Sequence, residues 1–201
     1  INSKDFADLD IYYLPDYINL YTNKFNDGLI FYYTEDEKKW FIPFLKKKIK
    51  INNKVFNEYY DLETPYGYGG PVSNSKDKKF LTKATNSFLM WCKSEKVTNL
   101  IIKFHPILKN EVFFMDKDFI LDRETLEIDL SNKTSSYEKL FHSMVKRNLN
   151  RSTREKVIIK TENSQNIISK IKEIYIQKMK SLKAQEFYFF DDDYFYKLMN
   201  I

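Results

Sequence analysis

The most informative stretch of this sequence runs Val55-Phe-Asn-Glu-Tyr-Tyr-Asp-Leu-Glu-Thr-Pro-Tyr-Gly-Tyr-Gly-Gly-Pro71. Its first half is rich in aromatic and branched residues, which is typical of a β-strand. Three of the chain's four glycines follow at once, and glycine permits positive φ and close approach of the backbone to a neighbouring group. The pattern predicts a strand running into a loop whose amides can point into a cleft. A tight turn that only ends the strand is the alternative.

The composition is that of a folded globular protein. Of 201 residues, 43% are hydrophobic and 17% aromatic, against four glycines and five prolines, which excludes a disordered or collagenous chain. The longest apolar runs fall well short of the roughly 20 residues that span a bilayer, and the N-terminus shows no secretory signal. One cysteine and two histidines exclude a disulfide framework and leave no metal-ligand pattern. We expect a cytoplasmic protein without a transmembrane segment.

The order of the expected elements defines the fold class. Helices are expected over residues 15–25 (ended by Gly28), 78–96 and 167–182, with others opening at Ser135 and after Asp191; strands are expected over 29–34, 39–45, 55–62, 99–104 and 157–160, with a hairpin from 119–121 to 125–130. Strands alternating with helices predict an α/β or α+β fold with a mixed sheet.

The helix opening at Ser135 ends in polar residues. Ser135-Ser-Tyr-Glu138 fits a capping box, and the apolar stripe of the helix continues onto Asn148 and Arg151, with Arg147 at its edge. An inward-facing arginine needs an anionic partner, so this face predicts a phosphate or carboxylate site. Two alternatives remain: the helix ends near Arg147 and the bases form a solvated face, or they pair with the acidic residues of 111–129.

Two further features are candidates for function. His105 follows a strand and precedes Pro106, a position typical of a cleft edge, although a lone histidine is more often structural than catalytic. Lys46-Lys47-Lys48, Lys50 and Lys54 form a basic run. Such a run is usually a solvated hairpin edge, and the alternative is a surface that holds nucleic acid or a membrane.

The order of these segments resembles the N-terminal part of FemAB-like proteins of the GNAT (N-acyltransferase) superfamily. The strings that carry the resemblance are DIYYLPDY (10–17), YDLETPYGYGGP (60–71), FHPIL (104–108), TLEIDL (125–130), KRNLNR (146–151) and FYFF (187–190). They span nearly the whole chain, and the glycine-rich and KRN strings are the most specific.

The resemblance implies tandem GNAT folds, each a mixed sheet flanked by helices. It places a first GNAT-like domain over residues 1–130 and the start of a second, truncated domain over 131–201. The sequence carries no phosphate-loop motif of the kind expected for the donor site, and its end lacks a helix stop signal. We therefore expect a fragment that is catalytically incomplete; a plain C-terminal helix is the alternative.

The resemblance also implies a function: transfer of an acyl or aminoacyl group to an amine on a cell-envelope or surface-polysaccharide precursor. The expected partners are an anionic small-molecule or lipid-linked precursor and, in the aminoacyl case, tRNA. Acyl-CoA or aminoacyl-tRNA would be the donor in the full-length protein, with no cofactor bound to the fragment. The expected substrate-binding residues are Tyr66, Gly67, Tyr68, Gly69, Gly70, His105, Arg147, Asn148 and Arg151. The alternatives are a non-catalytic RNA or anionic-ligand binding module and a degenerate structural subunit.

Overall fold

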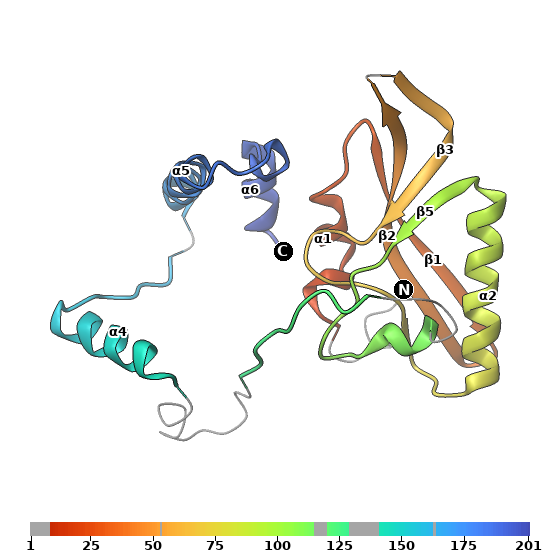
Figure 1. Ribbon diagram of the computed structural model, residues 1–201, viewed down its shortest axis with the longest axis horizontal. Coiled ribbons are helices and arrows are strands. Elements are labelled where there is room, and N and C mark those ends of the chain that lie inside the picture. The colour runs from red at the N-terminus through yellow and green to blue at the C-terminus, as the bar shows by residue number, and fades with distance from the viewer. Residues whose placement is uncertain (1–8, 53, 115–119, 129–140, 163) are drawn as a thin grey trace. The chain divides into compact units, whose positions relative to one another are not determined.

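A computed structural model describes residues 9–52, 54–114, 120–128, 141–162 and 164–201 (Figure 1). The chain forms two compact units. The first comprises Ile1–Ile120 and Lys172–Ile201, and the second Leu121–Ile171. The boundary that the resemblance implies, between residues 130 and 131, stays a prediction.

A five-stranded mixed sheet organises the first unit. Its order is β1-β2-β3-β5, with β4 paired to β2. The strands are β1 (Asn26–Glu35), β2 (Lys38–Ile51), β3 (Lys54–Glu63), β4 (Val72–Ser73) and β5 (Val97–Ile101). The first three strands form an antiparallel meander, whereas β5 runs parallel to β3. The predicted mixed α/β fold, an open sheet flanked by helices, is confirmed at this level.

Both faces of β2 are buried, which explains its unbroken apolar run. Trp40, Ile42 and Phe44 pack with Phe80 and Phe88 of α2 (Lys78–Ser94) on one face. On the other face, Phe41 and Leu45 contact the short helices η2 (Ile11–Tyr13) and α1 (Pro15–Asn19). Each fully buried large apolar side chain contributes about 1.5–3 kcal/mol, so these two layers hold the first unit together.

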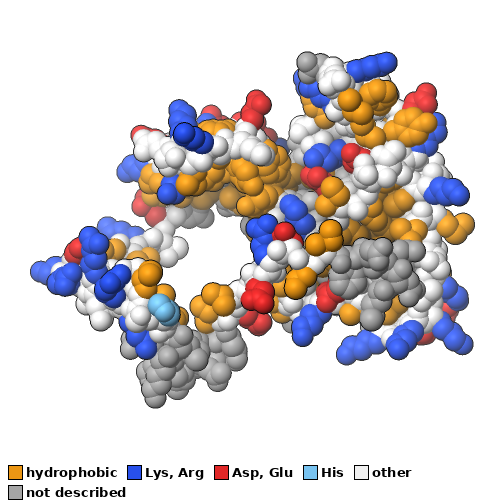
Figure 2. Space-filling model, in the orientation of Figure 1, with side chains coloured by type: hydrophobic (Ala, Val, Ile, Leu, Met, Phe, Trp, Pro, Cys, Tyr) orange, Lys and Arg blue, Asp and Glu red, His pale blue; other side chains and the backbone are white. Residues whose placement is uncertain are grey.

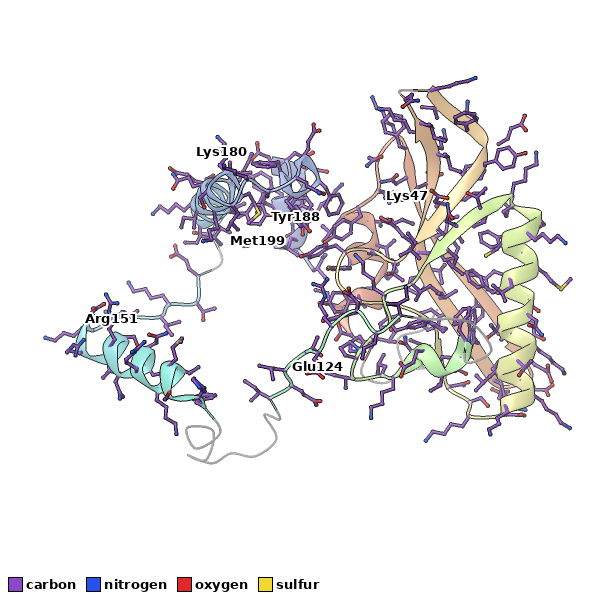
Figure 3. The ribbon with its side chains drawn as sticks, in the orientation of Figure 1. Lys47, Glu124, Arg151, Lys180, Tyr188 and Met199 are labelled. Carbon is purple, nitrogen blue, oxygen red and sulfur yellow. The ribbon has the colours of Figure 1, made fainter. Side chains whose placement is uncertain are left out.

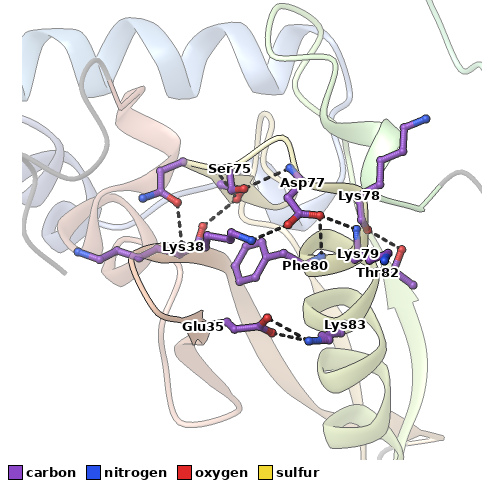
Figure 4. A network of polar contacts seen from close by, with 12 residues as sticks. Glu35, Lys38, Ser75, Asp77, Lys78, Lys79, Phe80, Thr82 and Lys83 are labelled. Carbon is purple, nitrogen blue, oxygen red and sulfur yellow. Dashed lines mark hydrogen bonds and ion pairs between the residues drawn. The ribbon is translucent and has the colours of Figure 1, made fainter.

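Polar contacts fix the start of α2 (Figure 4). Asp77 is its N-cap and accepts the amides of Lys79 and Phe80, which are orphan donors of the first turn. Lys38 bonds the same carboxylate and lowers the pKa of Asp77. One turn further on, Lys83 pairs with Glu35. The β1–β2 hairpin is thereby tied to the first turns of α2.

Most of the expected elements of the first unit are present. The strands predicted over 29–34, 39–45 and 55–62 lie within β1, β2 and β3, and the helix predicted over 78–96 is α2. Four details differ. The helix predicted over 15–25 ends at Asn19 as α1, and Gly28 lies inside β1 instead of ending that helix. Moreover, β5 covers 97–101 instead of 99–104, and β4 was not predicted.

Elsewhere the helices expected over 167–182 and after Asp191 are present, the helix expected to open at Ser135 is seen only from Ser143, with His142 as its N-cap, and the expected strands are not found among the described residues. The further helices are α4 (Ser143–Arg154), α5 (Gln165–Ser181) and α6 (Asp192–Leu198), with 3-10 turns η3 (Asn110–Phe114) and η4 (Glu186–Tyr188). Residues 120–128 and 157–160 form no strand, so the predicted hairpin and strand are wrong over these residues. A strand needs a partner strand to complete its backbone hydrogen bonds, and neither segment pairs with a strand of the described residues. The capping box at Ser135 lies outside the described residues.

Candidate functional site

The glycine segment and His105 meet where two parallel strands end. β3 stops at Glu63 and β5 at Ile101. Beyond them, the Lys103 amide donates to Thr64 Oγ1 at 3.1 Å, and the Gly69 amide donates to Lys103 O at 2.8 Å. The two following loops therefore stay side by side. The carboxyl end of parallel strands is where open α/β sheets commonly bind ligands.

His105 ties three parts of this region together. Its side chain is 5% exposed, and its Nδ1 accepts the amides of Ile107 and Leu108 at 3.2 and 3.3 Å. The proton must then be on Nε2, which lies 3.2 Å from Oδ2 of Asp10 and donates to it. Both ring nitrogens are thus occupied. In this arrangement His105 orients Asp10 and the loop and has no free nitrogen for a substrate.

Asn110, at the start of η3, is buried and makes several hydrogen bonds in the same region. It is 2% exposed. Its Nδ2 lies 2.8 Å from Gly69 O, 3.0 Å from Pro71 O and 3.1 Å from the Tyr13 hydroxyl. Its Oδ1 accepts the His105 amide at 2.9 Å. One side chain therefore joins the two loops and η2, and no buried polar group of this amide is left unpaired.

Two of the clustered glycines are required by geometry. Gly67 has φ 97°, and a methyl group there would lie 2.4 Å from Cε1 of Tyr12. Gly70 has φ 92°, and a methyl group there would lie 2.8 Å from Nδ2 of Asn110. Both positions combine a left-handed backbone with close packing, which only glycine tolerates without strain.

The glycine segment presents two available amides. Gly69 uses its amide in the bond to Lys103, whereas the amides of Gly67 and Tyr68 make no hydrogen bond to any residue that the structure describes. Both residues are half-buried. Since a backbone N–H is an obligatory donor, these amides suit water or an anionic ligand atom.

The glycine segment packs against aromatic rings, and these rings also contact His105, the partner of the Asp10 carboxylate. The Tyr12 ring packs edge-on against Tyr17 at 5.2 Å and Tyr68 at 5.7 Å between centroids. The Tyr68 ring lies 5.7 Å from His105. The carboxylate of Asp10 is 38% exposed. A carboxylate beside aromatic rings attracts an ammonium group, and free amides stabilise a developing oxyanion.

A chain of tyrosine hydroxyls connects the C-terminal segment to the glycine segment. Tyr17 OH donates to Tyr66 O at 2.8 Å. Its only proton is then used, so it must accept from Tyr21 at 3.3 Å, and Tyr21 in turn accepts from Tyr194 at 3.2 Å. Burial raises the pKa of Tyr17 to about 12 and, together with these hydrogen bonds, raises the pKa of Tyr21. The hydroxyls stay protonated, so the direction of donation is fixed.

Arg147, Asn148 and Arg151 lie on α4 of the second unit. The inward-facing position predicted for Asn148 and Arg151 is not seen: no residue of α4 is buried, and its apolar side chains Met144 and Val145 are exposed as well. Arg151, marked in Figure 3, donates Nε–H to Glu155 at 2.7 Å. The solvated-face alternative describes this helix. The structure therefore gathers Tyr66, Gly67, Tyr68, Gly69, Gly70 and His105 in the first unit and places the other three residues in the second.

Several residues of the site were not predicted as such. Asp10, Tyr12 and Tyr17 belong to the string DIYYLPDY, which supports the resemblance but predicts no site role; the one local signal is the Asp-x-Tyr spacing, which caps η2. Asn110 carries no sequence signal, because a buried asparagine has the same local pattern as a loop asparagine.

No protein-family model, curated protein or solved structure matches this chain. Among the residues that the structure describes, no group of histidine, cysteine, aspartate and glutamate side chains could hold a metal ion. Over the same residues, every helix is too short or too polar to traverse a bilayer.

Proposed function

We propose that this chain is part of an N-acyltransferase or aminoacyltransferase that acts on an amine of a cell-envelope or surface-polysaccharide precursor. The observation that carries the proposal is that two kinds of recognition group adjoin the same cluster of rings: Asp10 bonds His105, whose ring contacts Tyr68, and Gly67 packs against Tyr12. The carboxylate of Asp10 suits an ammonium group, and the amides of Gly67 and Tyr68 suit an oxyanion. The family resemblance supports the same reaction class.

The chemistry is aminolysis of an ester or thioester. The acceptor nitrogen forms a bond to the acyl carbon, the bond from that carbon to oxygen or sulfur breaks, and the amine proton passes to a weak base or water. Charge develops on the carbonyl oxygen, where preorganised amide donors contribute most. Asp10 would hold the amine beside the rings of Tyr12 and Tyr68, and positioning would supply much of the remaining rate enhancement.

The donor would be acyl-CoA or aminoacyl-tRNA, and the acceptor an anionic small-molecule or lipid-linked precursor. Arg147, Asn148 and Arg151 of the second unit are proposed to bind phosphate or carboxylate groups, since arginine binds such groups in a forked geometry.

The test compares two soluble peptidoglycan-type precursors, one with a free amine and one with that amine acetylated. We expect the free amine to bind more tightly by calorimetry, and Asp10→Asn to weaken its binding about tenfold, the effect of about 1.4 kcal/mol. Asn keeps an acceptor for His105, so the fold should persist. Asp16→Asn in α1 is the matched control, because Asp16 lies outside the cluster. Equal binding of both precursors would overturn the proposal.

The alternative, a module that binds RNA, is favoured by one observation. Arg147, Arg151 and Arg154 repeat at i, i+4 and i+7 on exposed α4, which places them on one side of the helix. RNA binding through this stripe would fall steeply with salt because phosphate contacts release counterions. Filter binding at two ionic strengths, with Arg154→Gln as the variant, distinguishes this module from the transferase.

A further inference from the structure

The end of the β2–β3 hairpin extends beyond the rest of the sheet (Figure 1). β1 pairs with β2 only as far as Lys47, and β5 pairs with β3 only from Tyr60 onward. Past these points the hairpin is a two-stranded ribbon, with Ile49 opposite Phe56 and Ile51 opposite Lys54. A two-stranded ribbon is marginally stable in water without a further contact.

The lysines of this hairpin divide into two groups. At its base, Lys46 pairs with Glu95 at 2.6 Å, and Lys47 (labelled in Figure 3) pairs with Glu63 at 2.7 Å. Further out, Lys48, Lys50 and Lys54 make no ion pair with a carboxylate among the described residues. The sequence has no acidic residue between Lys38 and Asn57. The hairpin end therefore carries a concentrated positive charge that no carboxylate of the described residues neutralises.

Apolar side chains lie among these lysines. Ile51 is 56% exposed, while Ile49, Val55 and Phe56 are half-buried. Figure 2 shows hydrophobic and basic side chains together at this end of the molecule. Exposure of an isoleucine side chain to water is unfavourable, and its transfer to an interface between water and hydrocarbon lowers the free energy.

We infer that the hairpin end, residues 48–52 and 54–56, binds the surface of an anionic phospholipid bilayer. Lysine attracts anionic headgroups and lets its aliphatic stem lie in the apolar layer beneath them. The apolar side chain of Ile51 would enter that layer. Nucleic acid is the less suitable partner, because the hairpin has no arginine for forked phosphate or base contacts. Tyr59 of β3 is 46% exposed, but the more exposed apolar side chain, Ile51 at 56%, is aliphatic and lies among the lysines of the hairpin end. The inference is independent of the proposed transferase function.

The test is co-sedimentation of the protein with vesicles of phosphatidylcholine alone or containing 30% phosphatidylserine. We expect binding to the anionic vesicles only, and at least about a tenfold loss in the triple variant Lys48→Gln/Lys50→Gln/Lys54→Gln. The matched control is Lys78→Gln/Lys79→Gln/Lys93→Gln on α2, which removes the same charge from exposed lysines elsewhere and should bind as the original protein does. Ile51→Ser should weaken vesicle binding while leaving binding to heparin unchanged.

Three outcomes would overturn the inference. Equal loss in both triple variants would show that only net charge matters, and tighter binding to duplex RNA than to anionic vesicles would identify nucleic acid as the partner. Displacement from the vesicles by 10 mM inorganic phosphate at constant ionic strength would indicate a site for single phosphates instead of a bilayer. Circular dichroism checks folding, and single Lys→Gln variants replace the triple variant if it unfolds.

Discussion

The backbone of Gly67 lies so close to Tyr12 that a methyl group on Gly67 would be 2.4 Å from Cε1 of the tyrosine ring. The φ of 97° at Gly67 adds a second constraint. The contact links the helical N-terminal segment to the glycine-rich loop, and it gives the first prediction.

Gly67→Ala should destabilise the protein by about 2–4 kcal/mol, combining the left-handed backbone and the steric overlap. In a Tyr12→Ala background the overlap is gone, so the same substitution should cost only about 1–2 kcal/mol. Urea unfolding of the four proteins measures this coupling. Equal costs in both backgrounds would mean that the tyrosine ring does not constrain the loop.

Asn110→Asp should be strongly destabilising, by about 2–4 kcal/mol near neutral pH, because three acceptors would face a buried carboxylate in place of an N–H₂ group. Asn74→Asp is the matched control. Asn74 also bonds the backbone through its side-chain oxygen and its side-chain nitrogen, but it is exposed. Its substitution should therefore reduce the stability less. Thermal unfolding at pH 7 compares the two variants, and similar losses would contradict the role of Asn110 as a buried hydrogen-bonding residue.

Because of the Tyr17 hydroxyl, the free energy of unfolding should decrease as the pH rises above 10. The folded pKa of this hydroxyl, about 12, exceeds the ordinary value of 10.0, so the unfolded chain loses this proton first and unfolding is favoured between pH 10 and 12. In Tyr17→Phe the decline should be shallower. Urea unfolding from pH 8.5 to 11.5 tests this, with phenolate absorbance as an independent readout. Identical slopes would refute the raised pKa.

Tyr194→Phe keeps the ring that stacks on Phe190 at 3.9 Å between centroids but removes the hydroxyl that donates to Tyr21. We expect a loss of about 0.5–1.5 kcal/mol and faster amide exchange in α6. Tyr196→Phe, in the same helix, is the control, because the Tyr196 hydroxyl bonds no residue within the described part of the chain. If both variants behave alike, the hydroxyl chain does not hold α6.

The sheet and α2 could be predicted because their signals are local. Alternating or continuous apolar residues mark β1 to β3, and Phe80, Ala84 and Phe88 recur at helical spacing. Residues 157–160 have the same apolar character, yet they form no strand. Strand propensity describes how a side chain packs on neighbouring strands, so a segment without such neighbours stays irregular.

The candidate site was predictable only in part for a related reason. The clustered glycines of a glycine-poor chain and the histidine that follows a strand can be recognised from the sequence alone. Asp10 and Asn110, by contrast, reach the site from positions 95 and 5 residues away from His105. Their roles depend on the packing of η2 and η3 against the loops, which no local pattern encodes.

The tyrosine hydroxyl chain ends on the carbonyl of Tyr66, and that carbonyl shares one peptide group with the amide of Gly67. A hydrogen bond received by a peptide oxygen draws electron density from the nitrogen and polarises its N–H bond. Each hydroxyl of the hydrogen-bond chain increases this polarisation in the same direction. The amide of Gly67 is consequently a stronger donor than an isolated peptide, and a phenol on α6 adjusts its strength from the far end of the sequence.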